Sequence, residues 1–160
     1  MGDHFLKKVV VERIALCTSL IIGTVLVVAA LGKFFYPSEL MKTLDRWVSV
    51  FEIIFIFTIL YFRNRWQMWI LAAAVFFAWG GYALYWYYLE LPCGCMGAKL
   101  HIPTLYTILV DMLFFVAALT IAYLLRASSR WIWIGVATAL IGALIGYLMA
   151  GRIYEAVILG

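Results

Sequence analysis

The sequence predicts an all-α membrane protein, a polytopic bundle of about five transmembrane helices with a four-helix core and a C-terminal helix. Of its 160 residues, 68% are hydrophobic and only 12% are charged, and the mean hydropathy is +1.06. Soluble domains have about 25% charged residues. Apolar runs approaching the ~20 residues that cross a bilayer recur along the chain. We therefore expect one transmembrane domain over residues 1–160, surrounded by membrane lipid.

Each expected span ends at a polar or helix-breaking segment. The spans cover about residues 14–35, 48–62, 68–89, 104–125 and 131–150. The first exceeds the roughly 7–15 apolar residues of a signal peptide, so we interpret it as a retained helix. Pro37 ends it, and Ser38 is expected to cap a short interfacial helix that reaches Trp47. A basic turn at 63–65 separates the second and third spans, and another at 126–130 precedes the fifth.

The basic residues indicate the orientation and exclude a class of partner. The formal charge is +4, but Lys and Arg lie between apolar runs, where they set topology and meet lipid head groups. We therefore expect no nucleic-acid binding. With the N-terminus inside, seven of the 12 basic residues are cytoplasmic, namely Lys7, Lys8, Arg13, Arg63, Arg65, Arg126 and Arg130. This bias predicts a bacterial inner-membrane protein with a cytoplasmic N-terminus and residues 90–103 in the periplasm.

Three ionisable residues fall inside the predicted spans: Lys33, Glu52 and Asp111. Connectivity places the end of the first span, the start of the second and the start of the fourth on one side of the membrane. The three charges should therefore gather at the membrane edge beneath loop 90–103. Such charges usually face the bundle interior and have partners. The alternative is that Lys33 extends to the interface and the carboxylates lie close to water.

Loop 90–103 contains two cysteines one residue apart, Cys93 and Cys95, with Gly94 between them and Gly97 after them. A disulfide across this spacing closes a small strained ring, and strained disulfides tend to be labile or catalytic. Gly94 supplies the backbone freedom that the ring needs. A nearby lysine ammonium favours thiolate, which is the reactive form. We therefore predict a redox-active pair, supported by the three buried charges.

Two other roles remain open for the same loop. Cys93, Cys95, Met96 and His101 are soft or borderline ligands that suit Cu(I), so a copper-binding or transport component is the alternative. A structural disulfide in a non-catalytic assembly subunit is the other. So tight a ring would stabilise the fold little, because it closes a very short stretch of chain.

Several further residues have simpler interpretations. Cys17 lies alone in the first span, where cysteine usually acts as a small apolar residue. The Tyr and Trp residues that end the third span are typical of an aromatic belt, although a quinone head group could stack there. Gly142 and Gly146 form a small-residue motif that allows close helix contact. The motif fits packing within the bundle and a homo-oligomer equally well.

These features together resemble the MauE/DoxX-type redox-associated membrane proteins. The resemblance spans about Ile14 to Leu125 and consists of Gly32-Lys33, Glu52, the Cys-Gly-Cys-x-Gly loop from Cys93 to Gly97, and Asp111. It implies a small helical bundle in which Cys93 and Cys95 are the redox pair. It also implies a periplasmic thioredoxin-like partner and a role in maturing disulfide-containing proteins such as methylamine dehydrogenase.

We therefore expect thiol–disulfide exchange with that partner. We further expect this exchange to be coupled to membrane quinone.

Overall fold

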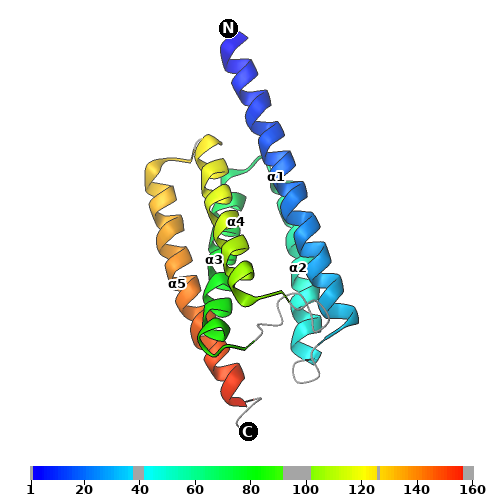
Figure 1. Ribbon diagram of the computed structural model, residues 1–160. Helices are drawn as coiled ribbons and strands as arrows, with labels where there is room; N and C mark the ends of the chain where they lie inside the picture. Colours follow the sequence, from blue (N-terminus) through cyan, green and yellow to red (C-terminus); the bar gives the residue numbers. More distant parts are fainter. Residues whose placement is uncertain (1, 38–41, 92–101, 126, 157–160) are drawn as a thin grey trace.

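Five α-helices make up the part of the chain that the computed structural model describes, residues 2–37, 42–91, 102–125 and 127–156. They alternate in direction along the bundle (Figure 1), and their bounds are α1 (Gly2–Phe35), α2 (Lys42–Phe62), α3 (Trp66–Tyr88), α4 (Thr104–Leu124) and α5 (Ser129–Tyr154). No strand occurs in these ranges. All helices except α2 are long and apolar enough to cross a membrane. The predicted all-α, multi-pass membrane fold is confirmed.

The first two helices begin earlier than the predicted spans. α1 starts at Gly2, and its N-terminal part projects beyond the other helices in Figure 1. Hydropathy locates only the lipid-embedded part of a helix, which explains the difference. α2 starts at Lys42, so residues 42–47 do not form the separate interfacial helix that the sequence suggested. No proline or glycine interrupts the chain between Lys42 and Phe62, and one continuous helix results. The proposed cap Ser38 lies outside the described residues.

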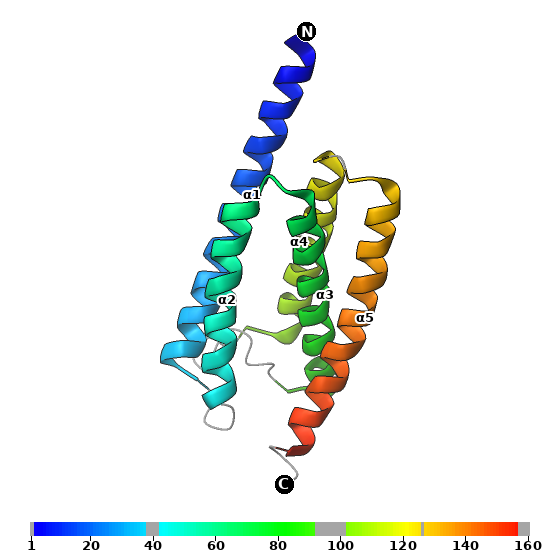
Figure 2. The same cartoon turned by 180° about the vertical axis from the view of Figure 1, so that it is seen from behind.

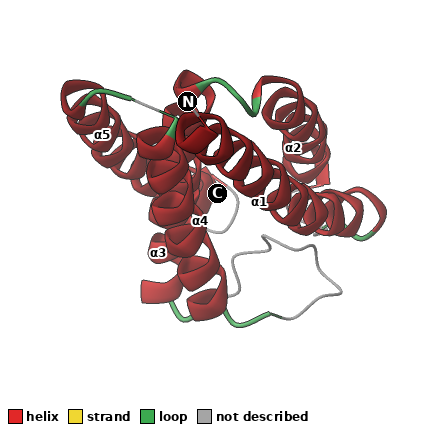
Figure 3. Ribbon diagram, turned by 90° about the horizontal axis from the view of Figure 1, so that it is seen from above, coloured by secondary structure: helices red, strands yellow, loops and turns green. Residues whose placement is uncertain are grey.

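The helices form two units that meet along a seam. α1 packs closely on α2, while α3 packs closely on both α4 and α5. Contacts between the two units are few and run mainly from α1 to α4 and from α2 to α3. Viewed from above, the α1–α2 pair lies to one side of the other three helices (Figure 3). Figure 2 shows the short connection from α2 to α3 at the end of the bundle nearer the N-terminus.

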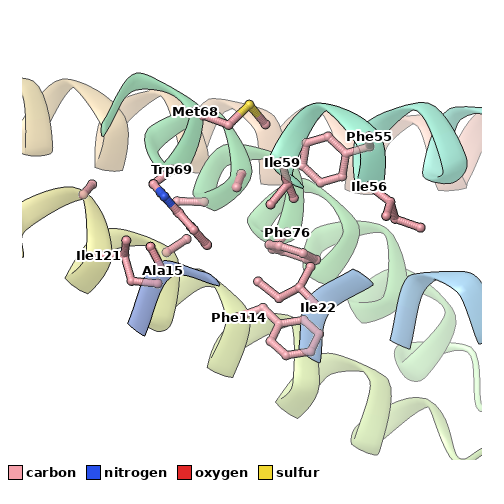
Figure 4. Packing of buried hydrophobic residues seen from close by; sticks show 14 of the residues in the cluster. Ala15, Ile22, Phe55, Ile56, Ile59, Met68, Trp69, Phe76, Phe114 and Ile121 are labelled. Atoms are coloured by element: carbon pink, nitrogen blue, oxygen red, sulfur yellow. The ribbon is translucent and has the colours of Figure 1, made fainter. Parts of the chain in front are cut away.

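A hydrophobic core closes the seam at that end. It includes the fully buried side chains of Ile22, Ile59, Trp69 and Phe76, which come from α1, α2 and α3 (Figure 4). The indole Nε1 of Trp69 donates a hydrogen bond to the backbone carbonyl of Arg63, 2.6 Å away. The core thus fastens the two units at the turn between α2 and α3. At the opposite end, where the chain leaves α3 and enters α4, polar residues replace it.

Glycines allow α3 and α5 to approach backbone to backbone. A Cβ added at Gly81 of α3 would overlap the backbone carbonyl of Ala143, and one added at Gly146 of α5 would overlap that of Ala78. The small-residue motif predicted in the fifth span therefore serves packing within the bundle.

Candidate functional site: a charged cavity at the seam

A buried ion pair joins the two helices of the first unit. Lys33 lies in the last turn of α1, and its Nζ donates a hydrogen bond to Glu52 Oε1 of α2 at 2.5 Å. Only 5% of Lys33 and 3% of Glu52 are exposed. The lysine therefore turns into the bundle, which overturns the alternative in which it extends to the interface. Because the pair is buried in a low-dielectric environment, removing either partner would destabilise the fold strongly.

Asp111 of α4 lies across the seam from this pair. It is 8% exposed, and the same cavity is lined by Lys33, Glu52 and Asp111. Asp111 interacts electrostatically with both of the other charges. The structure thus brings together the three ionisable residues that the sequence singled out. Because α2 begins at Lys42, Glu52 lies about 15 Å along its helix, deeper than a span starting at residue 48 suggested.

The polar side chains come from stripes on two helices that both line the cavity. On α2 the stripe is Asp45, Ser49 and Glu52, spaced four and three residues apart, and on α4 it is Thr104, Thr107 and Asp111. All six are buried. Residues at these spacings share one helix face, so each stripe follows from its sequence once the helix is known. The Ser49 hydroxyl donates to the backbone carbonyl of Asp45 at 2.8 Å, which satisfies it within the helix.

Asp45 was not predicted as a site residue. Its sequence neighbourhood indicated an interfacial segment, yet Asp45 is 7% exposed and lines the cavity. The signal that could have found it is the spacing from Asp45 through Ser49 to Glu52, which continues one polar face back from the intramembrane glutamate. This stripe is visible only if residues 42–62 are treated as a single helix.

The cavity has a volume of about 440 Å³ and is mainly apolar. Its polar wall is formed by Lys33, Asp45, Glu52, Tyr82, Thr107 and Asp111, and its apolar wall includes Phe76, Trp79, Phe114, Ile145 and Met149. Small-molecule sites are typically concave, largely apolar and about 300–1,000 Å³, with a few placed polar groups. The cavity therefore combines a buried polar cluster with an apolar wall, and this combination suits an amphiphilic ligand.

The aromatic residues at the end of α3 divide into two groups. Tyr85 and Trp86 turn inward and pack against Tyr154 of α5, with ring centroids 6.3 and 6.2 Å from it. Tyr87 and Tyr88 are 45% and 69% exposed, as residues of an aromatic belt would be. The cluster thus contributes both to the α3–α5 contact and to the outer surface.

The cysteine loop joins the bundle at the polar end of the seam. Cys93, Gly94, Cys95, Met96, Gly97 and His101 all lie outside the described residues, so the redox pair and the copper ligands remain predictions. The segments on either side are described. Thr104 Oγ1 of α4 donates to the backbone carbonyl of Leu91 at 3.2 Å, and Ile102 lines the cavity. The residues that flank the loop are thus held at the start of α4, the helix that carries Asp111.

A C-terminal cap directs the chain from α3 into this loop. The Glu90 N–H bonds to the Tyr87 carbonyl and the Leu91 N–H to the Trp86 carbonyl, both at 3.1 Å, which is a Schellman motif. Glu90 takes a positive φ of 55°, a conformation that costs a residue with a Cβ about 1–2 kcal/mol. The motif ends α3 and fixes the backbone at Glu90 and Leu91.

We expect Glu90→Gly to raise the free energy of unfolding by about 0.5–1 kcal/mol, because glycine adopts a positive φ without strain. Reversible unfolding in mixed micelles measures the change. Glu155→Gln, a charge removal at a 64% exposed side chain, is the control and should change little. A destabilised Glu90→Gly variant would mean that the glutamate side chain makes a stabilising interaction.

Cys17 lies far from this cavity. It is an exposed, free cysteine of α1, 16 residues before Lys33, which corresponds to about 24 Å along the helix. It is therefore too distant to react directly with a thiol held near the charged residues.

Comparison with protein-family models, with curated proteins and with solved structures found no match to this chain.

Proposed function

We propose that this chain is a membrane thiol–disulfide redox protein in which Cys93 and Cys95 exchange electrons with a periplasmic thioredoxin-like partner. The proposal includes membership of the MauE/DoxX-type family, a bacterial inner-membrane location with the N-terminus in the cytoplasm, and a role in maturing disulfide-containing proteins such as methylamine dehydrogenase.

One observation carries the proposal. The buried Lys33–Glu52 pair and Asp111 line one cavity at the end of the bundle where the cysteine segment joins α3 and α4. A charge within a transmembrane helix costs about 2.5–3.5 kcal/mol on insertion scales. Three such residues at a single place impose a cost that a purely structural bundle would avoid. The cluster therefore favours a functional role. Groups that stabilise a thiolate and accept its proton are what a reactive dithiol needs.

The exchange itself proceeds in two balanced steps. A thiolate of the Cys93/Cys95 pair attacks one sulfur of the partner's disulfide, forming a mixed disulfide and releasing the partner's other sulfur as a thiolate. The second cysteine then attacks the mixed disulfide, which oxidises the Cys93/Cys95 pair and leaves the partner as a dithiol. Two electrons move to the partner, and two protons leave the pair. The same steps run in reverse when the potentials favour it.

The roles of the buried charges follow from their chemistry. The Lys33 ammonium favours the thiolate form of a neighbouring cysteine, and Glu52 holds the lysine in place through its hydrogen bond. Asp111 has a carboxylate that can accept a proton released on oxidation. Lys33 and Glu52 act as positioning residues in this scheme, whereas Cys93 and Cys95 carry the electrons. In the reverse direction, the Cys93–Cys95 disulfide oxidises the partner's dithiol, and quinone is the membrane-soluble oxidant that would then re-oxidise the reduced pair.

Cysteine substitution tests the proposal. We expect single Cys93→Ser and Cys95→Ser variants to abolish exchange, and one of them to accumulate a mixed disulfide with a partner that disappears on reduction. Non-reducing electrophoresis of membranes measures this adduct. Cys17→Ser is the matched control and should behave as wild type. A double variant, Cys93→Ser with Cys95→Ser, that retains full exchange activity would remove the proposal and favour an assembly subunit.

A further inference from the structure

The cavity contains acceptor groups that no described residue satisfies. Asp111 is more than nine-tenths buried, lines the cavity and makes no hydrogen bond or ion pair within the described part of the chain. Glu52 uses Oε1 for Lys33, while its Oε2 is buried and has no hydrogen-bond partner. Buried carboxylate oxygens are normally paired, and leaving one unpaired costs several kcal/mol. The cavity therefore calls for a ligand that supplies positive charge or hydrogen-bond donors.

The described ionisable side chains of the cavity wall include more carboxylates than ammonium groups. Among the described residues, two intramembrane carboxylates, Glu52 and Asp111, line the cavity together with one ammonium, Lys33. Lys33 bonds to Glu52 and also interacts electrostatically with Asp111, so one ammonium is shared by two carboxylates. In a low-dielectric cavity such an imbalance raises the local concentration of cations.

The aromatic residues in the apolar part of the wall also favour a cation. The aromatic residues Phe76, Trp79 and Phe114 line the cavity, and their ring centroids lie 5.6 Å (Phe76–Trp79) and 5.1 Å (Phe76–Phe114) apart. Aromatic faces attract cations, above all weakly hydrated ones such as quaternary ammonium groups. The carboxylate and the aromatic rings thus favour the same type of ligand.

The lining residues point to an opening of the cavity between α2 and α5. These two helices make no contact with each other, yet Leu44 of α2 and Ile145 and Met149 of α5 all line the cavity. The same three side chains are 37%, 52% and 57% exposed. A ligand with an apolar body can therefore reach the cavity from the bilayer without crossing the polar end of the bundle.

We propose that this cavity binds an amphiphilic cation, with its positive group at Asp111 and its apolar body among the aromatic residues toward the α2–α5 opening. The site goes beyond the proposed thiol exchange and requires neither cysteine. A quinone is a poorer match, because it offers only hydrogen-bond acceptors to a wall rich in acceptors.

Two probes of nearly equal size and opposite charge test the sign of the site. Full-length protein in an uncharged maltoside detergent is titrated calorimetrically with tetraphenylphosphonium and, separately, with tetraphenylborate. We expect saturable binding of one phosphonium per chain and at least about tenfold weaker binding of the borate, a difference of about 1.4 kcal/mol. Equal binding of both ions, or none of the phosphonium, would overturn the proposal.

Substitutions locate the site and separate it from the redox function. Asp111→Asn preserves shape and should weaken phosphonium binding at least tenfold, whereas Glu155→Gln, at an exposed carboxylate, should not. The melting temperature of each variant shows that it is folded. Unchanged binding by folded Asp111→Asn would contradict the assignment. The Cys93→Ser/Cys95→Ser variant should bind as wild type, so loss of thiol exchange and loss of cation binding are distinguishable.

A competition measurement identifies the source of the cation. If phosphatidylethanolamine displaces the phosphonium and phosphatidylglycerol does not, the natural ligand is the amine head group of a membrane lipid. If neither lipid displaces it, the ligand is a soluble amphiphilic amine. Displacement by decylubiquinone that persists in Asp111→Asn would instead indicate a neutral ligand and would contradict the proposal.

Discussion

Replacement of Lys33 by methionine will destabilise the protein by about 3–5 kcal/mol, because it leaves the Glu52 carboxylate buried without its cation. Methionine keeps the length and apolar stem of lysine, so loss of packing contributes little. The remaining carboxylate must then take up a proton or draw water into the seam. Unfolding in mixed micelles of maltoside and dodecyl sulfate measures the change.

The double variant Lys33→Met/Glu52→Leu tests whether the loss of stability comes from an unpaired buried charge rather than from lost packing. Replacing a whole buried ion pair by apolar residues is often neutral or stabilising, so we expect most of the lost stability to return. Lys42→Met, at an exposed lysine of α2, is the matched control and should change the free energy of unfolding by less than about 0.5 kcal/mol. A Lys33→Met variant as stable as this control would show that the ion pair is not buried.

The second large effect is expected at the contact between α3 and α5. Gly81→Ala adds one methyl group where the backbone carbonyl of Ala143 already lies, so the two helices must separate. Overpacking of this kind costs about 1–3 kcal/mol. Gly146→Ala creates the reciprocal overlap with Ala78 and should have a similar effect. The same unfolding assay applies.

Gly23→Ala is the matched control, because it makes the same chemical change in a helix with room for it. Its added Cβ would lie 3.4 Å from Ile56 Cγ2, an ordinary contact. Alanine is a better helix former than glycine by about 1 kcal/mol, so this variant should be neutral or more stable. Equal effects of Gly23→Ala and Gly81→Ala would mean that α3 and α5 are not packed backbone to backbone.

Hydropathy and connectivity predicted much of this architecture. The apolar runs located the helices, since lipid requires each span to satisfy its own backbone hydrogen bonds. Connectivity alone placed Lys33, Glu52 and Asp111 at one end of the bundle, because successive spans must alternate in direction. The structure brings these residues to one cavity and adds the pairing of Lys33 with Glu52.

Other features depend on packing between helices, which hydropathy does not report. The seam between the α1–α2 unit and the remaining helices arises because α3 uses its small residues for α5 and leaves few contacts for α2. Asp45 was missed because its neighbours are charged, although it shares a buried face with Glu52. The in-bundle use of Gly146 was likewise left open, since the same motif can join two chains.

The central claim is that the buried charges activate the Cys93/Cys95 pair, and the alkylation rate of these two cysteines tests it most directly. In a Cys17→Ser background they are the only cysteines of the chain. A membrane-impermeant maleimide applied to the periplasmic face should react with the reduced pair several-fold faster when Lys33 and Glu52 are present than in the Lys33→Met/Glu52→Leu variant. Equal rates in the two proteins, or reaction only from the cytoplasmic face, would contradict the account.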